Sequence, residues 1–122
     1  MLSSLAAERY ISLTTFRRDG TPVSTPVWVV TDDRRRLLVW TGAKTWKVRR
    51  IRRDPRVLVA AASVRGKERG RRYAGRARIV PDPGIAALLR AKYGWQKRAL
   101  DLLDRSSEPE SWATVEIVAD NA

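Results

Sequence analysis

The sequence predicts a mainly β fold, a barrel of six to seven antiparallel strands with helices, and two observations lead to this prediction. Short runs rich in β-branched and aromatic residues recur along the chain between turn signals, which is typical of many short strands. One basic crossing helix and a C-terminal helical pair separate these runs, so several strands must pair with distant partners. Closure of such a sheet removes its exposed edges, which favours a small barrel. We expect the 122 residues, 43% of them apolar, to form one domain over residues 1–122.

The first half is predicted to begin with a short helix over residues 3–9, followed by three strands. The first strand, Tyr10–Phe16, leads to Asp19-Gly20, a dipeptide that supplies the positive φ of a tight hairpin turn. The returning strand covers residues 23–31, although Pro26 has no N–H and therefore marks a bulge or an unpaired edge. The third strand covers residues 36–41.

A strongly basic helix is predicted within residues 41–57, which read TGAKTWKVRRIRRDPRV. Thr41 is either its N-cap or the last residue of the preceding strand, and the helix ends at Asp54-Pro55. At 100° per residue, Val48 and Ile51 share one face, and the side chains of Trp46, Arg49 and Arg53 point the other way.

Two lysines, Lys44 and Lys47, are predicted to lie in about the first turn of this helix. The helix dipole is positive there, so carboxylates and not ammonium groups would stabilise the helix. A bound phosphate would resolve this conflict, because it could accept the free backbone N–H groups while both lysines close around it. The alternative is that both lysines are ordinary exposed helix residues.

The second half is predicted to contain a central strand over residues 56–64, whose near-continuous apolar run suits burial on both faces. A loop at residues 65–70 leads to a strand over residues 71–80, in which Gly75 marks a bulge or a close approach. The helical pair covers residues 84–93 and 95–104, residues 106–110 form a polar loop, and the last strand is Trp112–Ala119.

The composition excludes several kinds of chemistry. The chain has no Cys and no His, which excludes disulfides, thiolate nucleophiles, Ser-His-Asp triads and typical zinc sites. An enzyme with this composition would therefore depend on a cofactor, and we predict no catalytic side chain and no metal ligand. No stretch approaches the roughly 20 apolar residues of a membrane span and no export signal is evident, so a cytoplasmic location is expected.

The net charge of +12 lies entirely in two segments. Residues 44–56 and residues 65–78 each contain seven basic residues and one acidic residue, and each contributes +6. Such a localised field indicates an anionic partner, although solvated arginine-rich faces would produce the same pattern. On the strand at residues 71–80, Arg72, Arg76 and Arg78 share a face that suits a cofactor tail, a partner subunit or solvent.

Three stretches carry a family resemblance, LTTFRRDGTPVSTPVWVV, LLVWTGAKTWKVRRIRRDPRVLVAA and YAGRARIV. Together they resemble the split β-barrel flavin and deazaflavin oxidoreductases. Within these, the chain is most similar to small pyridoxamine-phosphate-oxidase-class proteins that depend on coenzyme F420, an 8-hydroxy-5-deazaflavin. The resemblance covers residues 10–80, and the last strand occupies its expected place. It implies an FMN-binding split-barrel fold and a homodimer with cofactor sites at the interface, each built from both chains.

The resemblance also implies cofactor-binding residues. The family's phosphate-binding turn falls on residues 41–47, and Arg50 is a further contact to the phosphate or to the oligoglutamate tail of the deazaflavin. The strand pair that lies along the ring falls on residues 14–15 and 26–28. Trp46 stands where flavin-binding oxidases tend to have an arginine, which favours the deazaflavin. The implied residues are Thr14, Thr15, Pro26, Val27, Trp28, Thr41, Lys44, Thr45, Lys47 and Arg50.

The leading hypothesis from the sequence is an oxidoreductase that transfers a hydride between coenzyme F420 and an unidentified small molecule. The nearest alternative is an FMN-binding oxidase of the pyridoxamine-phosphate-oxidase type, which would use the same phosphate turn. A basic nucleic-acid-binding module is a different class, and no RNA-binding or helix-turn-helix signature supports it. A cofactor carrier without turnover is a further alternative. At single positions, Trp28, Trp40 and Tyr73 also suit a core, and Thr14 and Thr15 also suit ordinary strand positions.

Overall fold

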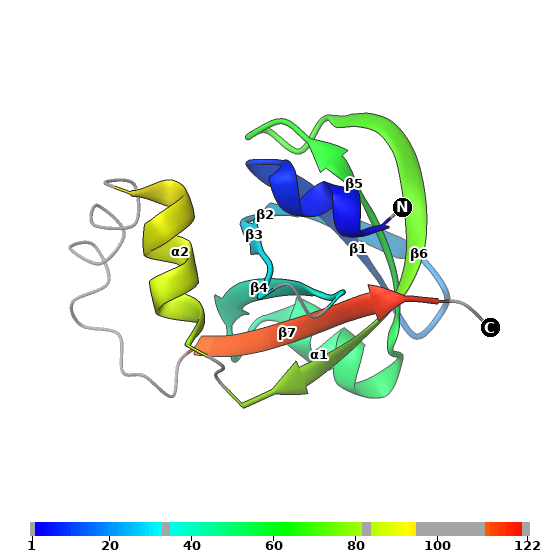
Figure 1. Cartoon of the computed structure of the whole chain (residues 1–122). Helices are drawn as coiled ribbons and strands as arrows, with labels where there is room; N and C mark the ends of the chain where they lie inside the picture. Colours follow the sequence, from blue (N-terminus) through cyan, green and yellow to red (C-terminus); the bar gives the residue numbers. More distant parts are fainter. Residues whose placement is uncertain (1, 33–34, 82–83, 95–111, 121–122) are drawn as a thin grey trace.

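The computed structural model describes residues 2–32, 35–81, 84–94 and 112–120. Seven strands in these ranges form the body of the molecule, and the helices lie around it (Figure 1). In chain order the elements are a 3-10 helix η1 (Leu2–Ala7), β1 (Tyr10–Phe16), β2 (Pro22–Val27), β3 (Val29–Val30), β4 (Leu37–Gly42), α1 (Trp46–Arg53), β5 (Arg56–Ala62), β6 (Glu68–Val80), α2 (Ile85–Tyr93) and β7 (Trp112–Ala119).

The seven strands form one sheet in the order β2-β1-β5-β6-β7-β4-β3, and each neighbouring pair is antiparallel. The two strands at the ends of this order, β2 and β3, are separated in the chain by Trp28 alone. The sheet therefore curls round and brings its two end strands together. Trp28 joins these strands covalently, and within the described ranges no ladder of hydrogen bonds pairs them. This confirms the predicted mainly β split barrel.

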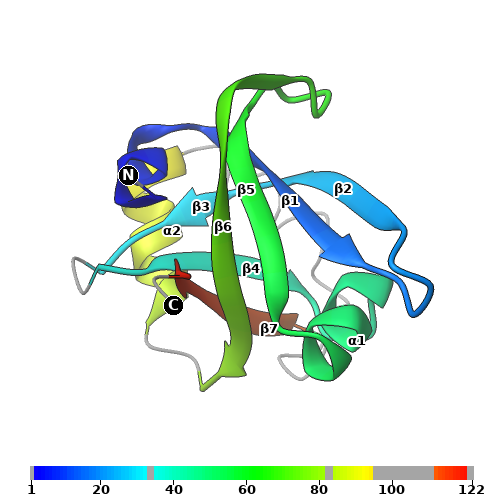
Figure 2. The same ribbon diagram turned by 90° about the vertical axis from the view of Figure 1, so that its right-hand side faces the viewer.

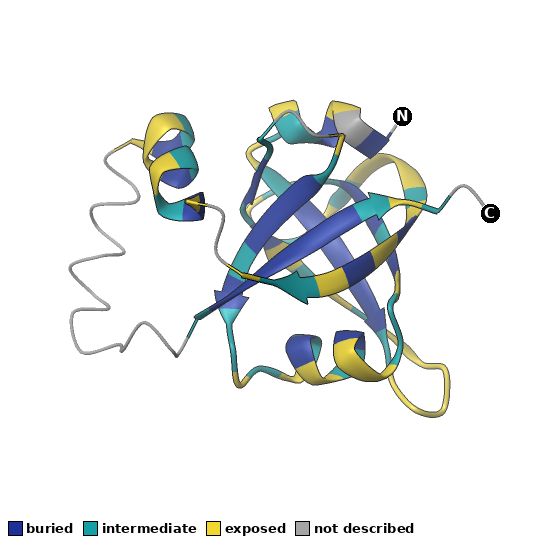
Figure 3. Cartoon of the chain, turned by 60° about the horizontal axis from the view of Figure 1, so that its bottom comes forward, coloured by how far each residue is buried: buried dark blue, intermediate teal, exposed yellow. Residues whose placement is uncertain are grey.

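Alternate residues of the strands point into the barrel and form its core. Val57 and Val59 of β5 and Val115 and Ile117 of β7 are at most 2% exposed and belong to one hydrophobic cluster. Figure 3 shows that the buried parts of the strands gather in the middle of the molecule. Because side chains of a strand alternate between faces, residues in between, such as Leu58, lie on the outside.

Helix α1 covers the end of the barrel at which β1 and β4 finish and β5 begins (Figure 2). Val48 and Ile51 are buried, as expected of the two apolar residues on one face. The helix is shorter than residues 41–57, because its N-cap is Thr45. Thr41 instead belongs to β4, where its inward position and its pairing with Ala113 continue the strand.

Helix α2 packs on the outer side of β3 and β4. Ile85, Leu89 and Tyr93 form a second hydrophobic cluster with Val30 and Leu38. Three backbone acceptors hold the end of the helix, since Lys92 Nζ donates to the carbonyl oxygens of Ala6, Glu8 and Val29 at 2.6–2.7 Å. The Tyr93 hydroxyl accepts the Val29 N–H at 3.0 Å and donates to the Arg9 carbonyl at 2.8 Å.

Several predicted elements differ in detail from the structure. The first helix is a 3-10 helix, and the strand predicted over residues 23–31 is divided at Trp28 into β2 and β3. Strand β6 starts at Glu68, so the preceding loop is shorter than expected. Gly75 is confirmed as a close approach, since a Cβ there would lie 3.0 Å from the Val118 oxygen, while the register shift of β6 lies elsewhere.

The predicted helix at residues 95–104 and the loop at residues 106–110 lie outside the described residues. Pro26 lies on β2, where it is paired with Ser12 of β1. β2 is an edge strand, as the missing N–H of Pro26 led us to expect. In the described part of the chain, none of the helices has the length and apolar character that a membrane crossing requires.

Candidate functional site

The turn between β4 and α1 leaves the start of the helix open to an anion. Thr45, the N-cap, donates its hydroxyl to the Gly42 oxygen at 2.8 Å and makes no capping bond to the helix. The first turn contains no acidic residue. The first intrahelical bond runs from the Arg49 N–H to the Thr45 oxygen. The backbone N–H groups before it have no acceptor within the helix, and they belong to Trp46, Lys47 and Val48.

Lys47 lies half-buried beside this helix start. Burial lowers the pKa of its ammonium group, and the nearby positive charge of Arg50 lowers it further. In the described ranges, neither side chain has a carboxylate within ion-pair distance. An anion bound here would relieve the desolvated charge of Lys47 and accept the free N–H groups at the same time. We call Lys44, Thr45, Lys47 and these N–H groups the anion seat.

The structure brings most, but not all, of the predicted phosphate residues to this seat. Thr45 and Lys47 are at the helix start, and Lys44 is exposed in the turn just before it. Thr41 is 6% exposed and faces the inside of the barrel from β4. Thr41 therefore lies on the core side of the anion seat and is not part of it.

The residues predicted to lie along the cofactor ring are divided between two faces of β1 and β2. Thr14 and Pro26 are on the outer face, where the Thr14 hydroxyl shares a hydrogen bond of 2.6 Å with Ser24. Thr15 and Val27 alternate with them and face the core. Pro26 is exposed and is placed to meet a ligand on the surface, whereas Thr14 is 1% exposed and, like the inner pair, can only support that surface from within.

Trp28, the last of the predicted ring residues, lies under α2. Its ring stacks on that of Tyr93 with centroids 4.4 Å apart and an angle of 11° between the planes. Trp28 is also the residue at which the chain passes from β2, paired with β1, to β3, paired with β4. Trp28 therefore anchors the C-terminal helix to the barrel.

Two hydroxyl groups inside the barrel have no hydrogen-bond partner among the described residues. They are Thr15 Oγ1 and Thr25 Oγ1, both buried on the inner side of β1 and β2. A buried hydroxyl without a partner is costly, so bound water or a ligand atom is expected beside these groups. Thr15 was predicted from the family resemblance, and its missing partner is an independent observation about the same residue.

A groove of about 620 Å³ lies next to the anion seat, between α1 and the β1–β2 turn. Trp46 is 66% exposed in it, and the Arg49 guanidinium lies 4.9 Å from the centroid of the Trp46 ring. Arg50 connects the two places, because it lines the groove and stands beside Lys47. We call this the arginine groove, and its lining residues are Arg17, Arg18, Trp46, Arg49, Arg50 and Arg53.

Sequence reasoning identified only Arg50 among these lining residues as a site residue. It missed Arg17 and Arg18, because nothing in the chain indicates that a hairpin turn meets a helix some thirty residues later. One signal for the groove was present in the sequence, because Arg49 and Arg53 share the outward face of the helix with Trp46.

The two basic segments have different environments in the structure. In the second segment, Arg69, Arg72 and Arg78 form ion pairs with Glu8, Glu68 and Glu116 at 3.4, 2.6 and 2.8 Å. In the first segment, the ion pair found within the described ranges joins Arg56 to Asp54 at 2.8 Å. Six basic residues of the first segment and four of the second then have no ion pair within the described ranges, so more unneutralised positive charge lies around α1, where it favours an anionic ligand.

A metal-dependent site finds no support in the described part of the chain. No group of three or more His, Cys, Asp or Glu side chains is placed there to hold a metal ion. The geometry instead combines a helix start, lysines and a groove lined by arginines, an arrangement that binds phosphates and carboxylates.

The chain matches the protein-family model described as "Pyridoxamine 5'-phosphate oxidase" over residues 1–120. None of the curated proteins compared with the sequence matches it. Among solved structures, a putative pyridoxamine 5'-phosphate oxidase from Listeria innocua is similar, with 19% identity, a TM-score of 0.64, and coverage of 98% of this chain and 90% of that one. An FAD-binding protein from Mesorhizobium loti has 22% identity, a TM-score of 0.60, and coverage of 98% and 85%. A protein described as an F420 reductase has 26% identity, a TM-score of 0.57, and coverage of 96% and 91%.

Proposed function

Because this chain belongs to the pyridoxamine 5'-phosphate oxidase family, we propose that it is an oxidoreductase that uses coenzyme F420. The reaction would transfer a hydride between the deazaflavin and a small molecule. The fold is that of flavin-binding oxidoreductases, and the similarity to an F420 reductase supports the choice of the deazaflavin.

The observation that supports this proposal most is the continuity of the anion seat with the arginine groove through Arg50. Coenzyme F420 has a phosphate followed by a chain of glutamates, so it presents a phosphate and then several carboxylates. The seat suits the phosphate and the groove suits the carboxylates, since guanidinium groups pair with carboxylates in a two-pronged geometry. FMN ends at its phosphate and would leave the groove without a ligand.

In this proposal the chain's own residues bind and orient the cofactor. Lys44, Thr45 and Lys47 hold the phosphate with the free N–H groups of α1, and Arg50 directs the tail into the groove. Pro26 faces the ring from the outer side of β2, and the buried Thr14 supports that face through its hydrogen bond with Ser24. The remaining predicted residues, Thr15, Val27, Trp28 and Thr41, support these strands from the core side or from under α2.

The bound deazaflavin supplies a hydride from C5 of its ring. The protein contributes mainly by holding that ring against the substrate, since the chain has no His to act as a general acid and a proton would come from water. We also propose a homodimer in which a second copy completes each site, as the family resemblance implies. Sedimentation velocity tests this second proposal by showing a species of twice the monomer mass.

The test is to titrate the purified chain separately with coenzyme F420, FMN and FAD. Binding is measured by calorimetry and by the change in tryptophan fluorescence. The expected result is saturable binding of coenzyme F420 at micromolar concentration and weaker binding of both flavins. Equal or tighter binding of FMN, together with a yellow protein as purified, would favour the FMN-binding oxidase instead. Absence of saturable binding by all three would overturn the proposal.

A further inference from the structure

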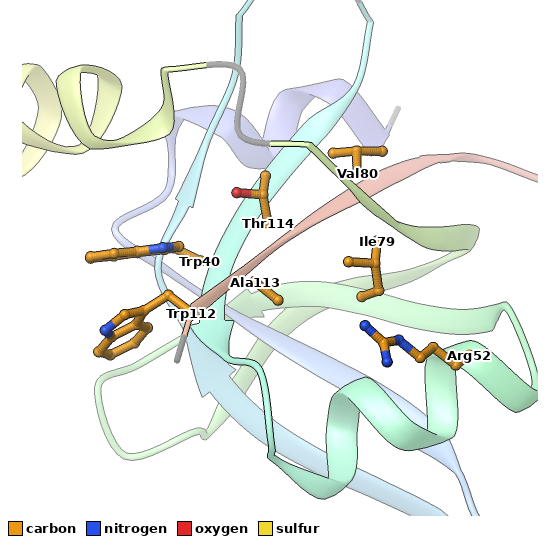
Figure 4. A pocket seen from close by; sticks show the side chains of 7 residues that line it. All are labelled: Trp40, Arg52, Ile79, Val80, Trp112, Ala113 and Thr114. Carbon is orange, nitrogen blue, oxygen red and sulfur yellow. The ribbon is translucent and has the colours of Figure 1, made fainter. Parts of the chain in front are cut away.

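A second hollow lies on the other flank of α1 from the arginine groove. It has a volume of about 270 Å³ and is bounded by β4, β6, β7 and α1 (Figure 4). None of the cofactor contacts proposed above lies among its lining residues. We call it the tryptophan pocket, and it is lined by Trp40, Arg52, Ile79, Val80, Trp112, Ala113 and Thr114.

The strand register explains why two tryptophans meet in this pocket. Trp40 of β4 and Val80 of β6 are both paired with Thr114 of β7, so these three residues form a row across the sheet. Trp112 lies two residues before Thr114 and therefore on the same face. The rings of Trp40 and Trp112 stack with centroids 4.4 Å apart and an angle of 28° between the planes. They form one aromatic wall.

Arg52 supplies a positive charge to this pocket. It lines this pocket and not the arginine groove, and it lies on the side of α1 beyond Arg49. No described carboxylate forms an ion pair with it. The acidic residue of the neighbouring face, Glu116, is already paired with Arg36 and Arg78. The guanidinium of Arg52 is thus available to a ligand in the pocket.

The size and charge of the pocket define the ligand that fits. A volume of about 270 Å³ corresponds to about nine water molecules at roughly 30 Å³ each, which is too large for a single ion and suits one or two fused rings. The stacked tryptophans favour a planar aromatic ring. One guanidinium balances one negative charge and pairs well with the two oxygens of a carboxylate, whereas a phosphate dianion would remain half-neutralised.

We propose that the tryptophan pocket binds a small planar aromatic carboxylate, with its ring against the Trp40–Trp112 wall and its carboxylate on Arg52. Thr114, which is 4% exposed, lines the same pocket beside Trp40 (Figure 4). This site is separate from the anion seat and does not depend on the proposed use of coenzyme F420.

The test compares two probes of the same shape, 2-naphthoate and its uncharged amide, by calorimetric titration without any flavin or deazaflavin. Naphthoate is expected to bind saturably with a dissociation constant of about 1 mM or below. Arg52→Gln is expected to raise the dissociation constant of naphthoate about tenfold or more and to change that of the amide by less than about twofold. The matched control is Arg71→Gln, which removes an exposed arginine near the other end of β6 and is expected to change neither probe.

Three results would overturn this proposal. One is the lack of saturable naphthoate binding, and another is an equal loss of both probes in Arg52→Gln. The third is that the wild type is a dimer that does not bind naphthoate and that Trp112→Leu dissociates this dimer. That result would assign the pocket to a subunit interface. Circular dichroism of each variant verifies that the fold is retained. Because no deazaflavin is present, failure here leaves the proposed function standing, and the reverse also holds.

Discussion

The Glu116 carboxylate accepts a hydrogen bond from Arg36 Nη1 at 2.7 Å and so joins β7 to the residue that precedes β4. The same carboxylate accepts a bond from Arg78 Nε at 2.8 Å, which joins it to β6 as well. Glu116 is 8% exposed, so its charge has lost most of its water. The two guanidinium groups replace that water and connect three neighbouring strands through one side chain.

We predict that Glu116→Gln destabilises the protein by about 1.5–3 kcal/mol at pH 7, because charge-assisted bonds are lost in a desolvated place. The bonds from Arg78 and Arg36 lower the pKa of Glu116 below its ordinary value. Its stabilisation is therefore fully present above the unfolded-state pKa of about 4.3 and is lost as the pH falls through the lower folded-state pKa. Urea unfolding at pH 7 and in acid measures the effect.

The control for this prediction is Glu8→Gln, which removes a carboxylate that meets Arg69 at 3.4 Å on the surface. It is expected to change the free energy of unfolding by less than about 1 kcal/mol. The difference between wild type and Glu116→Gln should shrink in acid. A difference that is the same at both pH values would show that the charge of Glu116 is not its source.

We predict that Lys92→Met loosens α2 and lowers the free energy of unfolding by about 1.5–3 kcal/mol. The substitution keeps an apolar stem of similar length but removes the Lys92 donor from the carbonyl oxygens of Ala6, Glu8 and Val29, of which Val29 keeps a bond of 3.0 Å from the Tyr93 hydroxyl. Thermal unfolding by calorimetry measures the loss. Lys67→Met, at an exposed position, is the control and should have little effect. Equal melting temperatures of the two variants would contradict the prediction.

The sequence was sufficient where local pattern and burial agree. β1 and β7 have the predicted limits, because their runs of β-branched and aromatic residues coincide with strands that are buried along most of their length. The basic helix was also predicted, but its start was not. Thr41 and Thr45 are both suitable caps, and only the pairing of Thr41 with Ala113 in the sheet decides that the strand continues.

Contacts between distant parts of the chain account for what could not be predicted. The strand over residues 23–31 is divided because its two parts have different partners, β1 for β2 and β4 for β3, and Trp28 stands between them. The second basic segment has the same net charge as the first, yet three of its arginines meet carboxylates, and two of these carboxylates, Glu8 and Glu116, come from other parts of the chain. Pairing of this kind depends on register and is not visible in composition.

We predict that Lys47→Ala weakens the binding of coenzyme F420 by about 1.5–3 kcal/mol, because a charge-assisted bond to the phosphate is lost. Calorimetric titration measures the affinity. The control is Lys67→Ala, which removes an exposed lysine just before β6 and is expected to bind like the wild type. Unchanged affinity in Lys47→Ala would place the phosphate elsewhere than at the start of α1.

We predict that Arg49→Gln separates the roles of the anion seat and the arginine groove. Arg49 lines the groove and lies over Trp46, so it should act on the glutamate tail and not on the phosphate. The variant is expected to weaken the complete cofactor by about 0.5–1 kcal/mol, the range of an exposed ion pair, and to leave a deazaflavin truncated after its phosphate unaffected. Titration of both ligands measures this difference.

Salt gives an independent measure of the same contact. Each exposed ion pair with the tail is screened by added salt, so the affinity of the complete cofactor should fall more steeply with salt in the wild type than in Arg49→Gln. Lys47→Ala should instead weaken both ligands, because both retain the phosphate. If Arg49→Gln weakened the truncated ligand as much as the complete one, the groove would be acting on the phosphate. The argument that the arginine groove favours coenzyme F420, which has a glutamate tail, over FMN, which has none, would then be wrong.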